Sequence, residues 1–267
     1  MGLILKKVHV FELASRANRM GKRFQTRLIR HLITKLKNRI PTPDFVSLLP
    51  QILEPADWLD EWFMKPFNGQ SQRIKHTVRL VDSFRPTIAI ETGTYYGTST
   101  TFLSRLVSGD TYSIEANQKY FDYSKGRLEH EKGRIHLLYG DSSIELPRIL
   151  EAIPPSSNRI LAYLDAHWYE NVPTQQEIES LVNWGGEWMA IIDDFEIPSD
   201  PGYKYDKYDK LTVGLDLIPK GKNLEVWVSG LDSEYETGAK RGTGYVFTKQ
   251  TRLGLSDLGL EGLIQIL

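Results

Sequence analysis

The stretch TIAIETGTYYGTS, residues 87–99, decides how the rest of the sequence is interpreted. Its first four residues, before Glu91, are apolar or β-branched, which is typical of a short buried strand. Gly93 and Gly97 follow at once, and residues 98–107 have a helical pattern. Glycines between a strand and a helix let the backbone turn tightly and approach a ligand at the helix N-terminus. The stretch therefore predicts a strand, a candidate binding turn and a helix.

The same alternation of strand and helix continues downstream. Further short apolar runs lie at residues 111–115, 134–139, 159–165 and 188–194. Helical patterns separate them at residues 118–131, 143–152 and 174–184. This spacing predicts βαβ units and a parallel sheet covered by helices on both faces. Because no comparable helix separates residues 224–229 from 244–248, we expect these two runs to pair antiparallel at one edge. The expected fold is α/β, with a doubly wound, mostly parallel sheet of seven strands.

The composition is that of an ordinary globular chain of 267 residues, of which 40% are hydrophobic and 25% are charged. Cysteine is absent, which excludes disulfides, thiolate nucleophiles and cysteine-based metal sites. A formal net charge of −1 excludes a wholly basic nucleic-acid binder. No apolar run reaches the ~20 residues that a membrane span needs, and the apolar run at the start is too short for a secretory signal. We therefore expect a cytoplasmic protein.

The first 40 residues differ from the rest, since they carry eleven Lys and Arg residues and only one acid. Apolar side chains recur there every four residues, at Phe24, Leu28, Leu32, Leu36 and Ile40. This pattern predicts a basic amphipathic helix. Such a helix suits peripheral contact with an anionic membrane or an organelle transit segment. It equally suits packing on the main domain or on a second copy of the chain as a homo-oligomer, and these alternatives stay open.

Pro41 and Pro43 then end the basic helix. We place a helical extension and linker at residues 1–70 and the main domain at residues 71–267.

The end of the first strand has the chemistry of a ligand site. In open α/β sheets, ligands bind beyond the carboxyl ends of the strands. The turn is not the dinucleotide pattern G-x-G-x-x-G, because Tyr95 and Thr98 occupy the second and third glycine positions. Glu91 at the strand end suits a ligand that carries an ammonium group rather than phosphates.

The next two strand ends suit a nucleoside. Glu115 lies 24 residues after Glu91, where a ribose diol is held in nucleoside-binding sheets. Asp141 and Ser142 follow the third strand and could hydrogen-bond an adenine edge. A solvated charge is the alternative for Glu115, and an N-cap of the next helix is the alternative for Asp141. Three such ends in order favour an adenosine-type ligand.

Three carboxylates follow the fourth and fifth strands, at Asp165, Asp193 and Asp194. We expect them to converge at the ligand crevice, where they repel one another unless they share a cation. An all-oxygen donor set favours Mg²⁺ or another divalent cation that keeps positions open for substrate. The alternative is that each Asp caps a neighbouring helix.

The order E-T-G-T-Y-Y-G-T-S, S-I-E, G-D-S, L-D-A-H-W and I-I-D-D resembles the class I S-adenosylmethionine-dependent methyltransferases. It resembles in particular their cation-dependent O-methyltransferase branch, such as catechol O-methyltransferase. The macrocin O-methyltransferases and the cephalosporin-hydroxylase-like proteins show a similar metal triad. The resemblance covers roughly residues 75–250. It implies a Rossmann-like methyltransferase fold and methyl transfer from S-adenosylmethionine to a hydroxyl of a small molecule (a diol, a catechol or a sugar), assisted by Mg²⁺ or another divalent cation.

The resemblance also implies roles for matching residues. The turn after the first strand contacts the methionine part of the cofactor, Glu115 its ribose, and Asp141 with Ser142 its adenine. The full cofactor set is Glu91, Gly93, Thr94, Tyr96, Gly97, Ser99, Glu115, Asp141, Ser142 and Asp165. The implied metal ligands are Asp165, Asp193 and Asp194.

The sequence departs from the family at the catalytic base. Catechol O-methyltransferase has D-H-W-K, whose lysine is the base, whereas this chain has D-A-H-W-Y. His167 is the nearby group whose ordinary pKa suits a base near neutrality, and Tyr169 is a weaker candidate. We therefore expect Asp165 and His167 to be catalytic. The aromatic residues Trp168, Tyr203, Tyr205 and Tyr208 are expected either to wall the acceptor pocket or to lie exposed in a turn.

Two other functions stay open to different degrees. A protein of the same fold could bind S-adenosylmethionine without transfer, or use the site for other chemistry as the cephalosporin-hydroxylase-like proteins do. A nucleic-acid methyltransferase is disfavoured, because the chain beyond residue 40 is acidic and lacks an N-P-P-Y type motif.

Overall fold

The computed structural model describes residues 65–267 except 132–133, 168–171, 210 and 256. The predicted basic helix lies outside the described residues, as do Trp168 and Tyr169. The described chain begins with a short 3-10 turn, η3 (Pro66–Gly69). Its Phe67 is fully buried, and the ring lies 4.8 Å from that of Tyr163 between ring centroids. Residues 66–69, which we expected in the linker, are therefore packed on the main domain.

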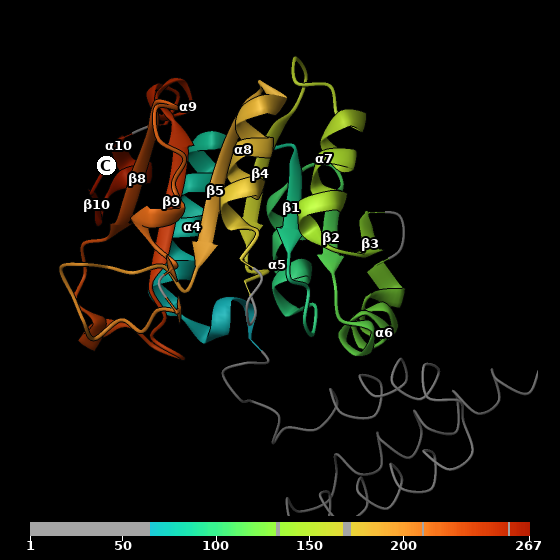
Figure 1. Ribbon diagram of the computed structural model, residues 1–267, viewed down its shortest axis with the longest axis horizontal. Helices are drawn as coiled ribbons and strands as arrows, with labels where there is room; N and C mark the ends of the chain where they lie inside the picture. Colours follow the sequence, from blue (N-terminus) through green and yellow to red (C-terminus); the bar gives the residue numbers. More distant parts are fainter. Residues whose placement is uncertain (1–64, 132–133, 168–171, 210, 256) are drawn as a thin grey trace, which may run out of the picture.

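An eight-stranded sheet forms the centre of the described residues, with strand order β10-β8-β9-β5-β4-β1-β2-β3 (Figure 1). The strands are β1 (Ile88–Thr92), β2 (Thr111–Glu115), β3 (Ile135–Tyr139), β4 (Arg159–Leu164), β5 (Glu187–Asp193), β8 (Leu224–Ser229), β9 (Thr243–Thr248) and β10 (Leu263–Gln265). β1 to β5 are parallel, whereas β9 pairs antiparallel with both β5 and β8. A separate two-stranded sheet joins β6 (Lys207–Tyr208) to β7 (Leu211–Thr212).

The predicted α/β fold and its antiparallel edge are confirmed, but the predicted strand count of seven is wrong. The additional strand is β10, which pairs antiparallel with β8. It has three residues, two of them exposed. A run this short carries too little of the period-two pattern to be recognised from the sequence.

Helices cover both faces of the sheet (Figure 1). They are α4 (Ser71–Phe84), α5 (Thr98–Leu106), α6 (Gln118–Arg127), α7 (Ser142–Ala152), α8 (Thr174–Trp184), α9 (Lys249–Leu253) and α10 (Asp257–Leu260). Short 3-10 turns form η4 (Leu128–Glu131), η5 (Leu215–Leu217) and η6 (Ser233–Tyr235). None of the helices in the described part of the chain is long and apolar enough to cross a membrane.

Each central strand supplies two hydrophobic cores, because successive side chains point to opposite faces. In β4, Ile160, Ala162 and Leu164 join the core under α7 and α8. Leu161 and Tyr163 alternate with them and join the core under α4 and α5. A strand buried on both faces reads as a continuous apolar run, which explains why these strands were recognisable from the sequence.

The register of the parallel strands brings their carboxyl ends to one edge. Thr92 at the end of β1 pairs with Leu164 of β4, and Leu164 pairs in turn with Ile192 of β5. The residues that follow, including Gly93 and Asp165, therefore emerge side by side.

The N-terminus of α4 is held by an acid from far along the chain. Helix α4 has no capping side chain of its own at Gln70. Instead, Glu236 accepts hydrogen bonds from the backbone N–H groups of Gln72 at 2.9 Å and Arg73 at 3.2 Å. A buried carboxylate at a helix N-terminus satisfies otherwise unpaired donors and complements the helix dipole. This contact fixes the end of α4 that carries Arg73.

We expect Glu236→Ala to lower the free energy of unfolding by about 2 kcal/mol, because the first turn of α4 loses its charged acceptor. Chemical denaturation measures the change. Glu234→Ala is the matched control, since Glu234 is exposed two residues away, and it should change stability by less than about 0.5 kcal/mol. Equal effects of the two substitutions would contradict the assigned cap.

Candidate functional site

A cleft of about 710 Å³ lies at the carboxyl ends of the parallel strands. One half is lined by residues at or just beyond the ends of β1, β2 and β3, namely Gly93, Glu115, Asp141 and Ser142. The other half is lined by Asn68, Asp165, Asp194, Asp206 and Arg241. The two halves are continuous, so one elongated molecule or two adjacent molecules can occupy the cleft.

The turn after β1 requires glycine at its first position. Gly93 has φ +83°, and a Cβ there would lie 2.2 Å from the carbonyl oxygen of Asp165. The backbone N–H of Asp165 donates to the Thr92 carbonyl at 2.9 Å, which draws the two strand ends together. Gly93 thus allows the β1 and β4 ends to pack directly against each other at the cleft.

The other predicted residues of this turn do not line the cleft. Glu91 is fully buried beneath it, where one carboxylate oxygen accepts from Ser113 at 2.6 Å and from Thr100. Burial raises the pKa of Glu91 to about 7. Its other oxygen, Oε1, has no hydrogen-bond partner among the described residues.

Hydroxyls and aromatic rings of the turn have structural contacts. Thr94 shares a 2.6 Å hydrogen bond with Ser113, and Ser99 accepts from the backbone N–H of Phe67 at 3.1 Å. Tyr96 packs against Tyr123, with ring centroids 4.8 Å apart. Gly97 has φ +73° at the start of α5. Direct contact of these residues with a cofactor stays a prediction.

Glu115 and Asp141 do line the cleft, and both also hold the backbone. Glu115 accepts one 2.8 Å hydrogen bond on each oxygen, from the backbone N–H groups of Tyr95 and Asn117. Burial raises its pKa. Asp141 accepts from the Ser143 N–H at 2.9 Å and is the N-cap of α7. The capping alternative for Asp141 is therefore confirmed, and its position beside the cleft leaves ligand contact open.

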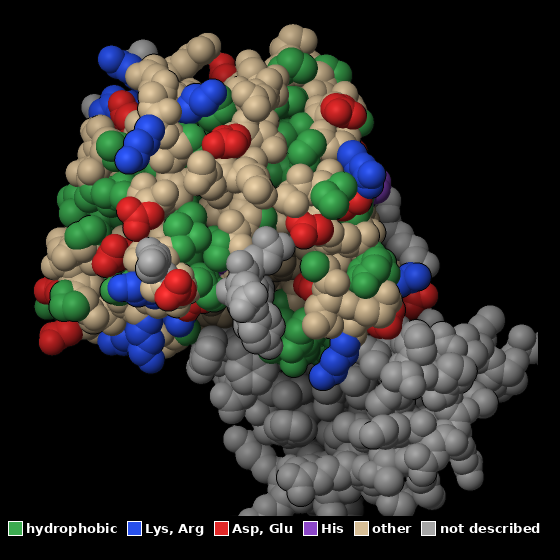
Figure 2. All heavy atoms as spheres, viewed as in Figure 1, with side chains coloured by type: hydrophobic (Ala, Val, Ile, Leu, Met, Phe, Trp, Pro, Cys, Tyr) green, Lys and Arg blue, Asp and Glu red, His purple; other side chains and the backbone are tan. Residues whose placement is uncertain are grey.

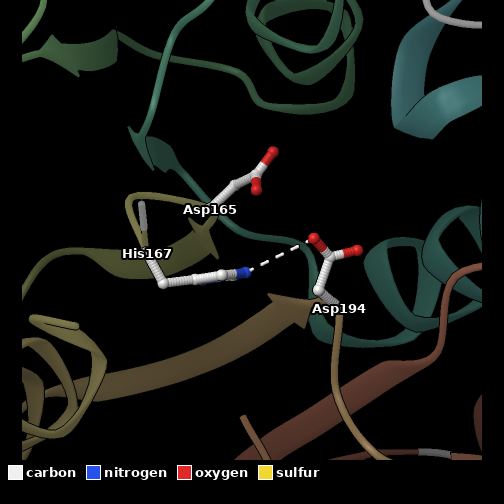
Figure 3. A group of neighbouring side chains, drawn as sticks. All are labelled: Asp165, His167 and Asp194. Carbon is white, nitrogen blue, oxygen red and sulfur yellow. Dashed lines mark ion pairs between the residues drawn. The ribbon is translucent and has the colours of Figure 1, made fainter. Parts of the chain in front are cut away.

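Beyond β4 and β5, the side chains of Asp165, His167 and Asp194 converge (Figure 3). One ligand atom from each lies within 4.8 Å of the other two. His167 is 2% exposed, and its Nε2 lies 3.6 Å from Oδ2 of Asp194. Burial alone lowers the pKa of His167, but the Asp194 carboxylate outweighs this and raises it. Burial raises the pKa of Asp165, and the two neighbouring carboxylates raise it further.

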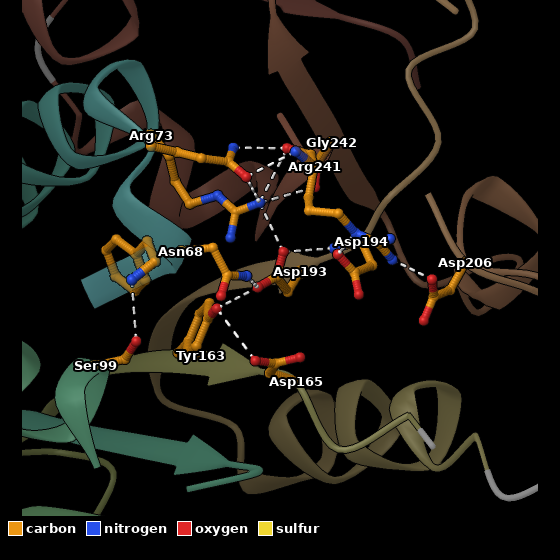
Figure 4. Close-up of polar contacts among 12 residues, drawn as sticks. Asn68, Arg73, Ser99, Tyr163, Asp165, Asp193, Asp194, Asp206, Arg241 and Gly242 are labelled. Carbon is orange, nitrogen blue, oxygen red and sulfur yellow. Dashed lines mark hydrogen bonds and ion pairs between the residues drawn. The ribbon is translucent and has the colours of Figure 1, made fainter. Parts of the chain in front are cut away.

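Asp193 does not line the cleft and is engaged by Arg73, Tyr163 and Asn68 (Figure 4). Its Oδ1 forms an ion pair with Arg73 at 2.6 Å, and both side chains are 1% exposed. Its Oδ2 accepts from the Tyr163 hydroxyl at 2.5 Å and from Asn68 at 3.4 Å. Burial acts to raise the pKa of Asp193, but the Arg73 guanidinium prevails and lowers it to about 2. The structure thus brings Asp165 and Asp194 together with His167 and gives Asp193 a different set of partners.

Arg241 and Asp206 complete the far wall of the cleft. Arg241 forms ion pairs with both Asp194 and Asp206 (Figure 4). Asp194 has φ +55°, in the left-handed region that non-glycine residues seldom adopt. Sequence reasoning missed Arg73, Arg241 and Asp206, because none of them belongs to a strand-end pattern.

The three described tyrosines that we expected either at the acceptor pocket or exposed in a turn lie in different environments. The Tyr208 hydroxyl donates to the His167 backbone carbonyl at 2.6 Å, so it supports the acidic group from behind. Tyr203 is buried in the core and donates to the Leu231 carbonyl at 3.1 Å. Tyr205 is 38% exposed.

Comparisons with known proteins rest on structure alone. No protein-family model matches the chain. No curated protein matches its sequence. The strand order, with β9 inserted antiparallel between β5 and β8, places the chain in a recognisable architecture. It is the Rossmann-like fold of class I methyltransferases.

Solved structures that the chain resembles include the O-methyltransferase from Bacillus cereus in complex with SAH, at 14% identity and a TM-score of 0.47, covering 82% of this chain and 97% of that one. The cofactor-bound Rv0187 from MTB has 14% identity and a TM-score of 0.49, with 79% and 99% covered. The O-methyltransferase TomG from Streptomyces achromogenes, in complex with SAM, has 12% identity and a TM-score of 0.43, with 79% and 90% covered. Since these TM-scores lie below 0.5, the fold assignment rests on the strand order.

Replacing Gly93 by Ala should lower the free energy of unfolding by more than the cost of placing Ala in a left-handed backbone conformation. Gly221 has a similar φ of +74°, but a Cβ added there would meet nothing within 4 Å, so Gly221→Ala isolates the backbone strain, at about 1 kcal/mol. Gly93→Ala adds the clash with Asp165 and should cost about 3 kcal/mol or more. Denaturant unfolding of both variants measures the difference. Similar losses would show that the β1 and β4 ends do not pack as described.

Proposed function

We propose that the protein transfers a methyl group from S-adenosylmethionine to a hydroxyl of a small molecule that carries two neighbouring hydroxyls, with the help of a divalent cation. The observation that carries this proposal is the continuous cleft. Its first half has the chemistry of a nucleoside site. Asp165 and Asp194 line its second half, and the buried ring of His167 lies against them. Methyl transfer needs this arrangement, because the activated methyl group and the attacked oxygen must be held in line.

The cofactor half has room and acceptors for S-adenosylmethionine. The Glu115 carboxylate accepts backbone hydrogen bonds from Tyr95 and Asn117, and an ionised carboxylate has about four lone-pair sites, so it can also accept from a ribose hydroxyl. Gly93 leaves the backbone bare where the methionine part would pass. Asp141 and Ser142 stand beside the cleft at the position for the adenine edge.

The acceptor half fits a divalent cation. Asp165 and Asp194 offer carboxylate oxygens, and the buried His167 ring offers a nitrogen that has no hydrogen-bond partner among the described residues. When bound, such an ion lowers the pKa of a substrate hydroxyl and fixes its orientation. The protein's own contribution is to hold these ligands still. Arg241 orients Asp194, and the Tyr208 hydroxyl anchors the backbone of His167.

A nucleic acid is not the acceptor in this proposal. On the face shown in Figure 2, basic and acidic side chains of the described residues are interspersed and do not form an extended basic patch. Nucleic-acid binding relies on such a patch to neutralise phosphates. A small molecule that enters the cleft fits the site better.

Cofactor binding is tested by titrating the full chain with S-adenosylmethionine in a calorimeter. Glu115→Gln should weaken binding about tenfold or more, because the ribose hydroxyls lose a charged acceptor. Glu151→Gln is the matched control, since Glu151 is exposed near the far end of α7, and it should leave the affinity unchanged. Equal affinities of the two variants would contradict the role of Glu115, and no binding by the unmodified protein would overturn the proposed function.

Methyl transfer is tested with methyl-labelled S-adenosylmethionine and a panel of catechols, sugar diols and matched single-hydroxyl compounds. We expect label on diols and not on their single-hydroxyl counterparts, since two adjacent oxygens are needed to chelate a cation. Chelation should remove the activity, and added divalent cation should restore it. Full activity after exhaustive chelation would contradict the cation's role. Cofactor binding without transfer to any compound would instead favour a binding protein of the same fold.

A further inference from the structure

The His167 ring is the least expected member of the acidic group. It is 2% exposed, and neither ring nitrogen has a hydrogen-bond partner among the described residues. Buried polar groups are almost always hydrogen-bonded, so a buried imidazole whose Nε2 comes no nearer than 3.6 Å to Asp194 needs a reason. Figure 3 shows the imidazole edge directed at the carboxylate of Asp194 with Asp165 beside it. A nitrogen donor thus points into the same space as two oxygen donors.

Arg73 keeps Asp193 out of this space. Its guanidinium lies 2.6 Å from Oδ1 of Asp193, and it also donates to the backbone carbonyls of Arg241 at 3.0 Å and Gly242 at 3.2 Å. The second carboxylate oxygen is engaged by Tyr163 at 2.5 Å. To reach a cation beside Asp165, Asp193 would have to leave a fully buried, oppositely charged partner, which is strongly unfavourable.

We infer that the cation site of the proposed methyltransferase consists of Asp165, His167 and Asp194, that Asp193 is not a ligand, and that the site prefers a transition metal such as Mn²⁺, Co²⁺ or Zn²⁺ to Mg²⁺. This inference rests on the proposed function and deepens it. Imidazole suits the transition metals, whereas Mg²⁺ is served best by oxygen alone. Ligand atoms that each lie about 2.0–2.2 Å from a shared metal ion are about 3 to 4 Å from one another. The three ligand atoms here lie within 4.8 Å of one another, so only a small contraction of the group is needed.

The inferred role replaces the general-base role that we expected for His167. A base must reach the proton that it removes. The ring nitrogen that faces Asp194 would be bound to the cation and could not accept a proton from substrate. His167 therefore sets the identity of the metal.

Metal titrations of the chelator-treated full chain test this inference. We expect one Mn²⁺ per chain, bound at least about tenfold more tightly than Mg²⁺. Pulsed electron paramagnetic resonance of the Mn²⁺ complex should show coupling to one imidazole nitrogen. His167→Ala should remove that coupling and lower the Mn²⁺ affinity about tenfold or more. Exposed His136, which lies 3.3 Å from Asp110, provides the control variant His136→Ala, which should change neither readout.

Asp193 is tested by a paired substitution, because its removal alone would leave Arg73 as a buried unpaired charge. Arg73→Gln combined with Asp193→Asn removes both charges and should leave the Mn²⁺ affinity within about threefold of the unmodified protein. S-adenosylmethionine binding, measured on every variant, reports that the fold and the cofactor half are intact.

Each contrary outcome has a distinct meaning. Mn²⁺ without nitrogen coupling, or an equal affinity for Mg²⁺, would overturn the inference in favour of an all-oxygen site. Loss of Mn²⁺ binding in the paired variant with cofactor binding intact would make Asp193 a ligand and also overturn it. If no metal binds while S-adenosylmethionine does, His167 and Asp194 form a simple ion pair and the inference is overturned, whereas the cofactor part of the proposed function still stands. Failure of S-adenosylmethionine to bind would overturn the proposed function itself.

Discussion

The ion pair between Arg73 and Asp193 is the buried charged contact that lies behind the acceptor half of the site. It joins α4, which precedes the first strand of the sheet, to the end of β5, and both side chains are 1% exposed. The same guanidinium also binds backbone carbonyls of residues 241 and 242, which lead into β9. One buried cation therefore ties together three segments that are distant in sequence. Removing either partner of such a pair commonly costs about 3 to 5 kcal/mol, since it leaves a buried charge without compensation.

The alternation of side chains at the end of β5 explains why Asp193 and Asp194, although adjacent in sequence, have different partners. Successive residues at the end of a strand point to opposite sides. Asp193 is directed to the face covered by α4 and is paired there. Asp194 adopts a left-handed backbone, accepts from Arg241 and faces the cleft. The backbone strain at Asp194, of order 1 kcal/mol, is stored where it aims a carboxylate at the site.

The positions of Glu115, Asp141 and Asp165 at one edge could be predicted from the sequence, because parallel strands of similar length must bring their carboxyl ends together. The partners of these acids could not be predicted. Arg241 lies 47 residues from Asp194, and no periodic pattern connects an arginine in a loop to a carboxylate at a strand end. The same limit applies to Glu91, whose strand-end position suggested ligand contact but whose side chain is buried beneath the turn by Ser113 and Thr100. Which face a strand-end side chain takes depends on the helices packed there.

The charges around the cleft are consistent with a third cation in addition to the two arginines. Four carboxylates, Asp165, Asp193, Asp194 and Asp206, lie within or directly behind it, and two guanidinium groups offset part of their charge. Arg73 is committed to Asp193, and Arg241 is shared between Asp194 and Asp206, which leaves Asp165 without a cationic partner of its own in the described part of the chain. Burial and its acidic neighbours accordingly raise the pKa of Asp165 well above its ordinary range. A divalent ion shared with Asp194 and His167 would supply positive charge beside Asp165. The two arginines therefore do not take the place of the cation; they reduce the excess negative charge to what a single dication can balance.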